Sequence, residues 1–157
     1  MAEHFMIPEG GKAERYAELY KQMAAVVDGE HDAIANMANM AAMLHATFRF
    51  WWTGFYRVAD GELVLGPFQG PIACTRIKYG RGVCGTAWKT QETQVVEDVE
   101  KFPGHIACSS LSRSEIVVPV WQGESIVAVL DIDSEHLATF DETDKAWLEK
   151  IVTLLYP

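Results

Sequence analysis

Apolar residues spaced three and four positions apart mark the helical segments of this chain. Between residues 11 and 27 this spacing predicts an amphipathic helix. The same spacing from Ile34 to Phe48, after the polar break DGEHD, predicts a second helix with a methionine-rich buried side. Near the end, Asp141 is placed to cap a third helix that runs to Leu155. Its predicted apolar face consists of Ala146, Trp147, Ile151 and Leu154.

Between these helices the apolar period changes to two, which is typical of strands. FRFWWTGFYRV and ELVLGPFQ, separated by Asp60-Gly61, predict a hairpin, and EIVVPVWQGESIVAVLDID predicts two more strands about a glycine-containing turn. IACTRIKY and QVVEDV read as short strands, and GRGVCGTAWKTQ reads as a glycine loop that opens into a short helix. KFPGHIACSSLSRS has no sustained period, so we expect a loop there.

The order of these elements predicts an α+β domain with an antiparallel sheet covered by helices. The length of 157 residues fits one domain, and no repeat or interdomain linker is present in the sequence. We therefore expect residues 1–157 to form a single domain with a core of about residues 34–155, on which the helix at 11–27 packs.

Composition narrows the class of protein. The net charge of −9, without a cluster of lysine and arginine, argues against binding nucleic acid. No apolar run reaches the roughly 18 residues that span a bilayer, and the polar start has no signal-peptide core, so we expect a cytoplasmic protein without a membrane partner. The three cysteines lack zinc-type spacing, and a reducing compartment would not preserve structural disulfides. If the cysteines have a function, we expect them to perform it as thiols.

One predicted strand carries an aromatic face. Strand alternation places Phe50, Trp52, Gly54 and Tyr56 on the same side. Gly54 would leave a gap between two rings that suits a small ligand, although ordinary core packing explains the same pattern.

Acidic residues interrupt another apolar strand face. Asp131 and Asp133 share a face with Val127 and Val129, where two carboxylates are costly to bury without a partner. They could receive an ammonium group or share a proton, or the strand could simply emerge into solvent. A two- or four-residue turn would point Glu115 of the preceding strand away from Asp131, whereas a three-residue turn or a bulge would bring them together. The sequence leaves this register open.

Each cysteine has a different local setting. Cys84 follows Gly82 near a predicted helix N-terminus, which would lower its pKa. Cys108 has small neighbours and His105 nearby, and Cys74 lies shortly before Arg76. On local sequence alone, we expect each to be an inert buried thiol.

The stretch from about Ile34 to Leu154 resembles a GAF domain, and within that family the free methionine-(R)-sulfoxide reductases. The resemblance rests on WWTGFYRV, GPFQGPIAC, GRGVCGTAW, SEIVVPV and VLDIDS, and above all on the three cysteines set among these blocks. It implies a six-stranded antiparallel sheet with helices on both sides, enclosing a pocket for one free amino acid.

The resemblance also assigns roles to residues. It implies Cys108 as the nucleophile, Cys74 and Cys84 as candidate resolving thiols, and Trp52 with Tyr56 as aromatic walls. The implied pocket carboxylates are Glu115, Asp131 and Asp133.

The mechanism that follows needs a thiolate and an acid together, because a sulfoxide oxygen leaves poorly unless it is protonated. Cys108 would attack sulfur while Glu115 or an aspartate protonates oxygen, and a second cysteine, preferably Cys74, would condense with the sulfenic acid. The expectation is an enzyme with no bound cofactor, whose disulfide is reopened by thioredoxin and ultimately by NADPH.

Two other functions remain open from the sequence. A non-catalytic GAF sensor would bind a small metabolite in the same pocket. A metal-binding module would use Cys74, Cys84, His105 and Cys108, although their spacings match no common zinc site, so no metal is expected. The sequence does not say whether the chain forms a homodimer.

Overall fold

The computed structural model describes residues 4–105 and 111–157 of the chain. Four α-helices, six strands and one 3₁₀ helix are formed in this part. In chain order they are α1 (Lys12–Val27), α2 (Ala33–Phe48), β1 (Trp52–Ala59), β2 (Glu62–Gln69), β3 (Arg76–Lys78), α3 (Gly82–Thr90), β4 (Gln94–Val96), η1 (Val99–Lys101), β5 (Ser114–Gln122), β6 (Ser125–Ser134) and α4 (Glu142–Val152).

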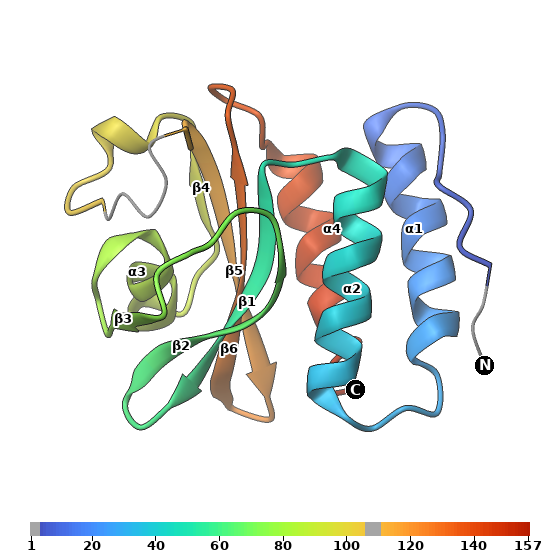
Figure 1. The fold of residues 1–157 in the computed structure, drawn as a ribbon, viewed down its shortest axis with the longest axis horizontal. Coiled ribbons are helices and arrows are strands. Elements are labelled where there is room, and N and C mark those ends of the chain that lie inside the picture. The colour runs from blue at the N-terminus through green and yellow to red at the C-terminus, as the bar shows by residue number, and fades with distance from the viewer. Residues whose placement is uncertain (1–3, 106–110) are drawn as a thin grey trace.

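The strands form one antiparallel sheet in the order β3-β2-β1-β6-β5-β4. The α2 and α4 helices cover one face with α1 outside them, and α3 lies on the opposite face (Figure 1). The predicted α+β fold, with a six-stranded antiparallel sheet between helices, is therefore confirmed. Its two centrally placed strands, β1 and β6, carry side chains into both layers.

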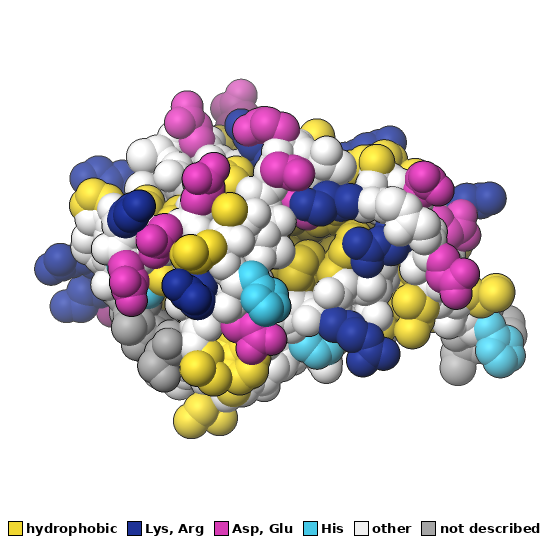
Figure 2. Space-filling model, turned by 90° about the horizontal axis from the view of Figure 1, so that it is seen from above, with side chains coloured by type: hydrophobic (Ala, Val, Ile, Leu, Met, Phe, Trp, Pro, Cys, Tyr) yellow, Lys and Arg dark blue, Asp and Glu magenta, His cyan; other side chains and the backbone are white. Residues whose placement is uncertain are grey.

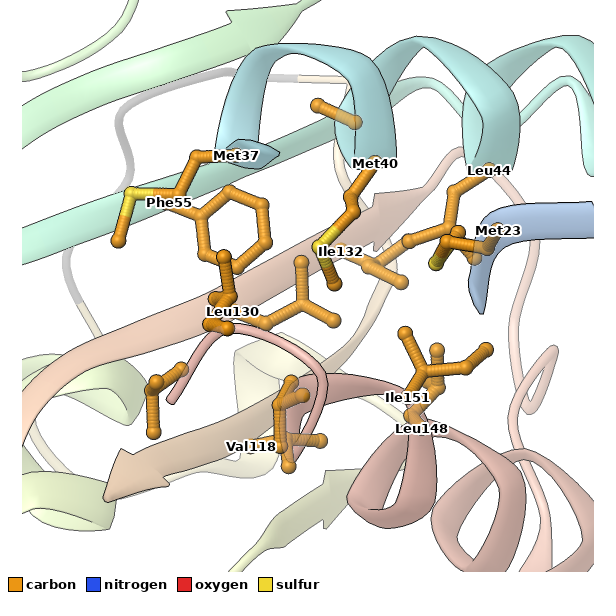
Figure 3. Close-up of a cluster of buried hydrophobic side chains, with 14 of the residues drawn as sticks. Met23, Met37, Met40, Leu44, Phe55, Val118, Leu130, Ile132, Leu148 and Ile151 are labelled. Carbon is orange, nitrogen blue, oxygen red and sulfur yellow. The ribbon is translucent and has the colours of Figure 1, made fainter. Parts of the chain in front are cut away.

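The larger apolar core fills the space between the sheet and α1, α2 and α4. Met37 and Met40 of α2 meet Phe55 and Leu130 of the sheet, as Figure 3 shows. The expected methionine-rich side of α2 is thus buried, although Ile34 at its start is exposed. Unbranched methionine side chains adapt to the irregular surface of the sheet.

The last helix differs from its prediction in extent and in face. It begins after Asp141, whose side chain accepts from the backbone N–H groups of Thr143 and Asp144 and so caps it as expected. It ends at Val152 rather than Leu155. Leu148 is fully buried, whereas Ala146 is exposed, so the buried stripe is rotated from the predicted one.

A buried polar cluster ties α1 to α4. The Tyr16 hydroxyl donates to Asp144 Oδ1 at 2.6 Å, and Lys12 Nζ donates to Asp144 Oδ2 at 2.7 Å. Asp144 also accepts from the backbone N–H of Asp141, so both carboxylate oxygens are paired. These bonds join the first helix to the last across most of the chain length.

The surface shows mixed charge. On the face seen in Figure 2, acidic and basic side chains are interspersed, with hydrophobic side chains between them. Among residues 4–105 and 111–157, no helix has both the length and the apolar character to cross a membrane.

Candidate active site

Three neighbouring strands bring the acidic and aromatic residues together on the α3 side of the sheet. Trp52 of β1 pairs with Asp133 of β6, which pairs with Glu115 of β5 on its other side. In the next row of the same face, Asp131 lies between Gly54 and Val117. The register therefore gathers all three carboxyls beside one aromatic residue.

A bulge produces this arrangement. The β5–β6 turn has two residues, Gly123 and Glu124, and the pairing begins in a register that would point Glu115 away from the aspartates. Between the pairs Trp121↔Ile126 and Val120↔Ala128 the register shifts by one residue. The extra residue, Val127, packs against the helix-side core instead of sharing the face of Val129 as predicted. A shift of one residue exchanges the faces of a strand, so Glu115 joins Asp131 and Asp133.

The aromatic wall is more compact than the sequence suggests. Trp52 stacks on Phe68 with ring centroids 5.2 Å apart and lies 5.8 Å from the ring of Tyr56. A side chain at Gly54 would collide with Trp52 and Phe68, because a Cβ there would lie 2.4 Å from the Cβ of Phe68. The expected gap for a ligand at Gly54 is therefore wrong: these rings occupy it. Phe50 is also not on this face, since it precedes β1 and packs on the helix-side core.

The wall holds the loop between β2 and β3 through two hydrogen bonds. Trp52 Nε1 donates to the carbonyl of Pro71 at 3.1 Å, and the Tyr56 hydroxyl donates to the carbonyl of Cys74 at 2.9 Å. Both rings thus pack against the pocket and position the backbone beside Cys74.

The α3 helix supplies Cys84 from the opposite side. It approaches the chain closely at Gly85, where a Cβ would lie 2.6 Å from the carbonyl oxygen of Lys78. Only glycine fits at this distance. Cys84 is 4% exposed, and its sulfur lies with carboxylate oxygens of Glu115 and Asp131 in a group whose atoms are all within 4.8 Å of one another.

Burial and mutual repulsion dominate the electrostatics of this group. Burial raises the pKa of Glu115 well above its usual range, and the charges of Asp131 and Asp133 raise it further. The pKa of Asp133 is likewise raised well above its usual range by burial and by the charge of Asp131. Burial also raises the pKa of Asp131, but hydrogen bonding with Glu115 and Cys84 opposes this rise. Asp131 is thus the best placed of the three to ionise.

The same effects make Cys84 a poor nucleophile. Burial raises the pKa of its thiol well above the usual range, and the nearby carboxylates, Asp131 first, raise it further. The pKa lowering expected from its place near a helix N-terminus is therefore wrong. A helix dipole is worth about 0.3–1 kcal/mol at exposed sites and is outweighed here by burial beside negative charge.

One cavity connects these groups. Its other lining residues were not predicted from the sequence as part of a pocket. Ile72 and Ala73 line it from the β2–β3 loop, Arg81 from the start of α3, and His105 and Ser112 from the loop before β5. Arg81 is the one lysine or arginine among the described lining residues. Burial lowers the pKa of His105, which leaves it neutral near pH 7 rather than a charged partner for a thiol. No local sequence pattern marks these positions, because folding of the loops onto the sheet brings them together.

The two cysteines within the described residues are in different states. Cys74 is disulfide-bonded, whereas Cys84 is a free, buried thiol. Cys108, the expected nucleophile, lies outside the described residues. The structure thus distinguishes the two candidate resolving thiols, Cys74 and Cys84.

The arrangement can bind a small cation and deliver a proton. Asp131 is 5% exposed, yet its Oδ1 atom has no hydrogen-bond partner within residues 4–105 and 111–157. A buried acceptor of this kind is costly unless a donor, such as an ammonium group, pairs with it. Glu115 and Asp133, whose pKa values are raised well above the usual range, can instead hold protons at pH values where an exposed carboxyl is ionised.

Comparison with known proteins shows close relatives across nearly the full length. Residues 30–155 match the GAF domain family. The chain is 56% identical over 156 residues to GAF domain-containing protein A of Dictyostelium discoideum, covering 99% of each chain. It is 46% identical over 145 residues to the free methionine-R-sulfoxide reductase of Escherichia coli, covering 92% of this chain and 88% of that one.

A solved structure is also closely similar. The free methionine-R-sulfoxide reductase of Neisseria meningitidis, in complex with its substrate, superimposes with a TM-score of 0.93 and 54% identity. The match covers 98% of this chain and 92% of that chain.

Proposed function

Because the chain belongs to the GAF domain family, in the branch of the free methionine-R-sulfoxide reductases, we propose that it reduces free L-methionine-(R)-S-oxide to methionine. One observation supports this most strongly: a cavity lined by Glu115, Asp131 and Asp133 on one side and by Trp52 and Tyr56 on another. Carboxyls suit the α-ammonium of an amino acid, and the rings suit its S-methyl end.

Asp131 is the carboxylate that pairs with the substrate ammonium in this proposal. Its unpartnered Oδ1 is buried in the cavity wall, and its pKa is the least raised of the three. A methionine sulfoxide inside a peptide has a neutral amide in place of this ammonium. Selectivity for the free amino acid then follows, because a peptide would leave the Asp131 charge buried and unpaired.

Glu115 is the proton donor, with Asp133 beside it. In the first step the Cys108 thiolate attacks the sulfoxide sulfur while the carboxyl of Glu115 protonates the oxygen. The oxygen is transferred to the Cys108 sulfur, which is oxidised by two electrons to the sulfenic acid, and the substrate sulfur is reduced by two electrons, so that methionine is released. Burial raises the pKa of the Glu115 carboxyl and so keeps its proton available at higher pH than in an exposed glutamate.

Cys74 is the resolving thiol. It attacks the sulfenic sulfur of Cys108, water leaves, and a disulfide forms. Two observations favour Cys74 over Cys84: Cys74 is disulfide-bonded, and Cys84 is a free thiol with a raised pKa.

A dithiol such as thioredoxin reopens the disulfide by thiol–disulfide exchange and takes its own electrons from NADPH. No bound cofactor is needed for either step. A reducing compartment such as the cytoplasm supplies this donor, and we propose that the protein works there.

A thioredoxin-coupled assay tests the proposal. NADPH consumption is measured with free methionine-R-sulfoxide, with the S diastereomer and with N-acetylmethionine-R-sulfoxide. We expect consumption with the free R form and little with the other two. Binding of the free R form without NADPH consumption would instead identify a sensor, the rival function, and equal rates with the N-acetyl compound would remove the role assigned to Asp131.

A further inference from the structure

Cys84 is a buried thiol for which the proposed reaction has no use. It lies on α3 opposite the carboxyls, and its thiol is free. Its sulfur and one carboxylate oxygen each from Glu115 and Asp131 lie within 4.8 Å of one another, and all three residues are buried. A thiolate sulfur with two carboxylate oxygens is a donor set for a borderline-soft divalent cation, not for Mg²⁺ or Ca²⁺, which prefer oxygen alone.

A second observation points to a ligand at this place. Asp131 Oδ1 has no hydrogen-bond partner among the described residues, although Asp131 is 95% buried and lines the cavity. The acceptor is therefore ready for either a hydrogen-bond donor or a cation. The thiol of Cys84 favours a metal cation over an ammonium group, because a thiolate is a strong metal ligand and only a weak hydrogen-bond acceptor.

We propose that Cys84, Glu115 and Asp131 form a binding site for a zinc-like divalent cation, which blocks the pocket by occupying the place of the substrate ammonium. This proposal rests on the proposed function only for the statement that cation and substrate compete.

The geometry permits such a site with small adjustments. Sulfur and oxygen ligands of a tetrahedral zinc ion lie about 3.5 Å apart, given bond lengths of about 2.3 and 2.1 Å. The three donor atoms lie within 4.8 Å of one another. Side-chain rotations that move them closer by about 1 Å bring them to this separation. Asp133 and His105 line the same cavity, so a fourth ligand or water has room beside them.

The site should behave as an inhibitory one and not as a resident cofactor site. The cation must displace protons from the Cys84 thiol and from Glu115, whose pKa values are raised by burial beside negative charge. Binding is therefore expected to strengthen as the pH rises.

The test uses full-length protein in which Cys74→Ser and Cys108→Ser leave Cys84 as the sole cysteine of the chain. Co²⁺ is titrated while the thiolate-to-metal charge-transfer absorbance is recorded, and Zn²⁺ is then added. We expect saturation at one Co²⁺ per chain and loss of the band as Zn²⁺ replaces Co²⁺. The matched control adds Cys84→Ala to the same background and should show no band.

Two further variants test the carboxylates in the same background. Asp131→Asn and Glu115→Gln should each weaken Co²⁺ binding at least about tenfold, the lower range for disturbing a metal site. Circular dichroism verifies that each variant is folded. Absence of the charge-transfer band in the single-cysteine protein, or a band unchanged by both substitutions, would overturn the proposal.

Competition separates this proposal from the proposed function. Free methionine-R-sulfoxide should release bound Co²⁺ from the single-cysteine protein. If the band forms but the sulfoxide neither binds nor displaces the cation, the metal site stands and the proposed substrate is wrong. If the sulfoxide binds and no band forms, the metal site is wrong and the substrate stands.

Discussion

The three pocket carboxyls affect both the proposed reaction and the free energy of unfolding. Each has a raised pKa because it is buried, and in Glu115 and Asp133 the charge of a neighbouring carboxylate adds to the rise. A buried acid with a raised pKa binds protons more tightly in the folded than in the unfolded chain. The free energy of unfolding is then greatest at acidic pH and declines as the pH rises from about 4 toward the folded-state pKa values.

Replacing Glu115 by glutamine tests this balance. Glu115→Gln removes one ionisable group from the cluster, so its free energy of unfolding should decline less than that of the wild type as the pH rises above the ordinary glutamate pKa of about 4. Urea unfolding at several pH values measures the difference. The exposed Glu124 in the β5–β6 turn offers a matched control, Glu124→Gln, which should follow the wild type. A steeper decline in Glu115→Gln than in the wild type would contradict the assignment.

Tyr56 has a role beyond forming a wall. Its hydroxyl donates to the carbonyl of Cys74, so Tyr56→Phe keeps the ring and removes the bond that holds the resolving cysteine. We expect disulfide formation to slow about fivefold, which corresponds to a hydrogen bond of about 1 kcal/mol, while the first release of methionine changes less. Sulfenic acid trapping and peptide mapping after one turnover measure the two steps.

The outcome for Tyr56→Phe distinguishes positioning from substrate contact. A change confined to the KM for the sulfoxide, with unchanged disulfide formation, would show that the hydroxyl serves the substrate and not Cys74. A mapped bridge between Cys84 and Cys108 would contradict the assignment of Cys74 as resolving thiol.

At the scale of elements, the bulge at Val127 is the feature that the sequence could not supply. The hydrophobic alternation predicted both strands and their turn, and it identified Asp131 and Asp133 on one face. A two-residue turn alone would have pointed Glu115 away from them. The bulge shifts the register by one residue and so reverses this effect of the turn. The sequence resemblance implied the observed arrangement without giving its cause.

Periodicity was most reliable where one face of an element packs on a continuous core. The extents of α1, α2 and the β1–β2 hairpin follow the predicted segments closely. Local sequence was least informative for Cys84 and Gly54, whose surroundings come from other elements: the sheet carboxyls in one case and the side chain of Phe68 in the other. Contacts of this kind depend on tertiary structure and leave no local pattern.

The attachment of α1 to α4 is a second property of elements. The Tyr16 hydroxyl donates to buried Asp144, and Tyr16→Phe would leave one carboxylate oxygen without that donor. Hydrogen bonds to charged groups are worth about 1.5–3 kcal/mol, so we expect the free energy of unfolding to drop by about 2 kcal/mol. Urea unfolding measures it.

A matched control exists one helical turn away. Tyr20 lies on the same helix with its ring beneath Lys150 Nζ, and no hydrogen bond of its hydroxyl is found within the described part of the chain. Tyr20→Phe should therefore cost little. Equal losses for the two variants would show that the Tyr16 bond to Asp144 contributes no specific stability.

At the scale of the whole molecule, the sheet separates a face that forms the main apolar core from a face that forms the candidate active site. The α1, α2 and α4 side contains the larger apolar core, which holds the buried apolar residues of these three helices. The α3 side contains a smaller cluster beside the cavity and its carboxyls. The cost of burying three acids on one face is offset by the packing on the other.

The division also explains why the site draws on so many segments. Strands β1, β5 and β6 supply the wall and the acids, α3 supplies Cys84, and the β2–β3 loop carries Cys74. A rigid sheet holds the groups that bind and protonate, while Cys74 and Cys84 lie on segments outside the sheet. Thiol chemistry on a substrate held by the sheet is the central claim of this account.

A single-turnover experiment tests that claim most directly. The protein is reduced, freed of reductant and mixed with excess free methionine-R-sulfoxide in the absence of thioredoxin, and the methionine released per chain is counted. We expect about one methionine per wild-type chain, because two thiols supply only two electrons when they form one disulfide. We expect none from a folded Cys108→Ser variant, because it lacks the attacking thiol. Release of methionine by Cys108→Ser at the wild-type level, or none by the wild type, would contradict the claim.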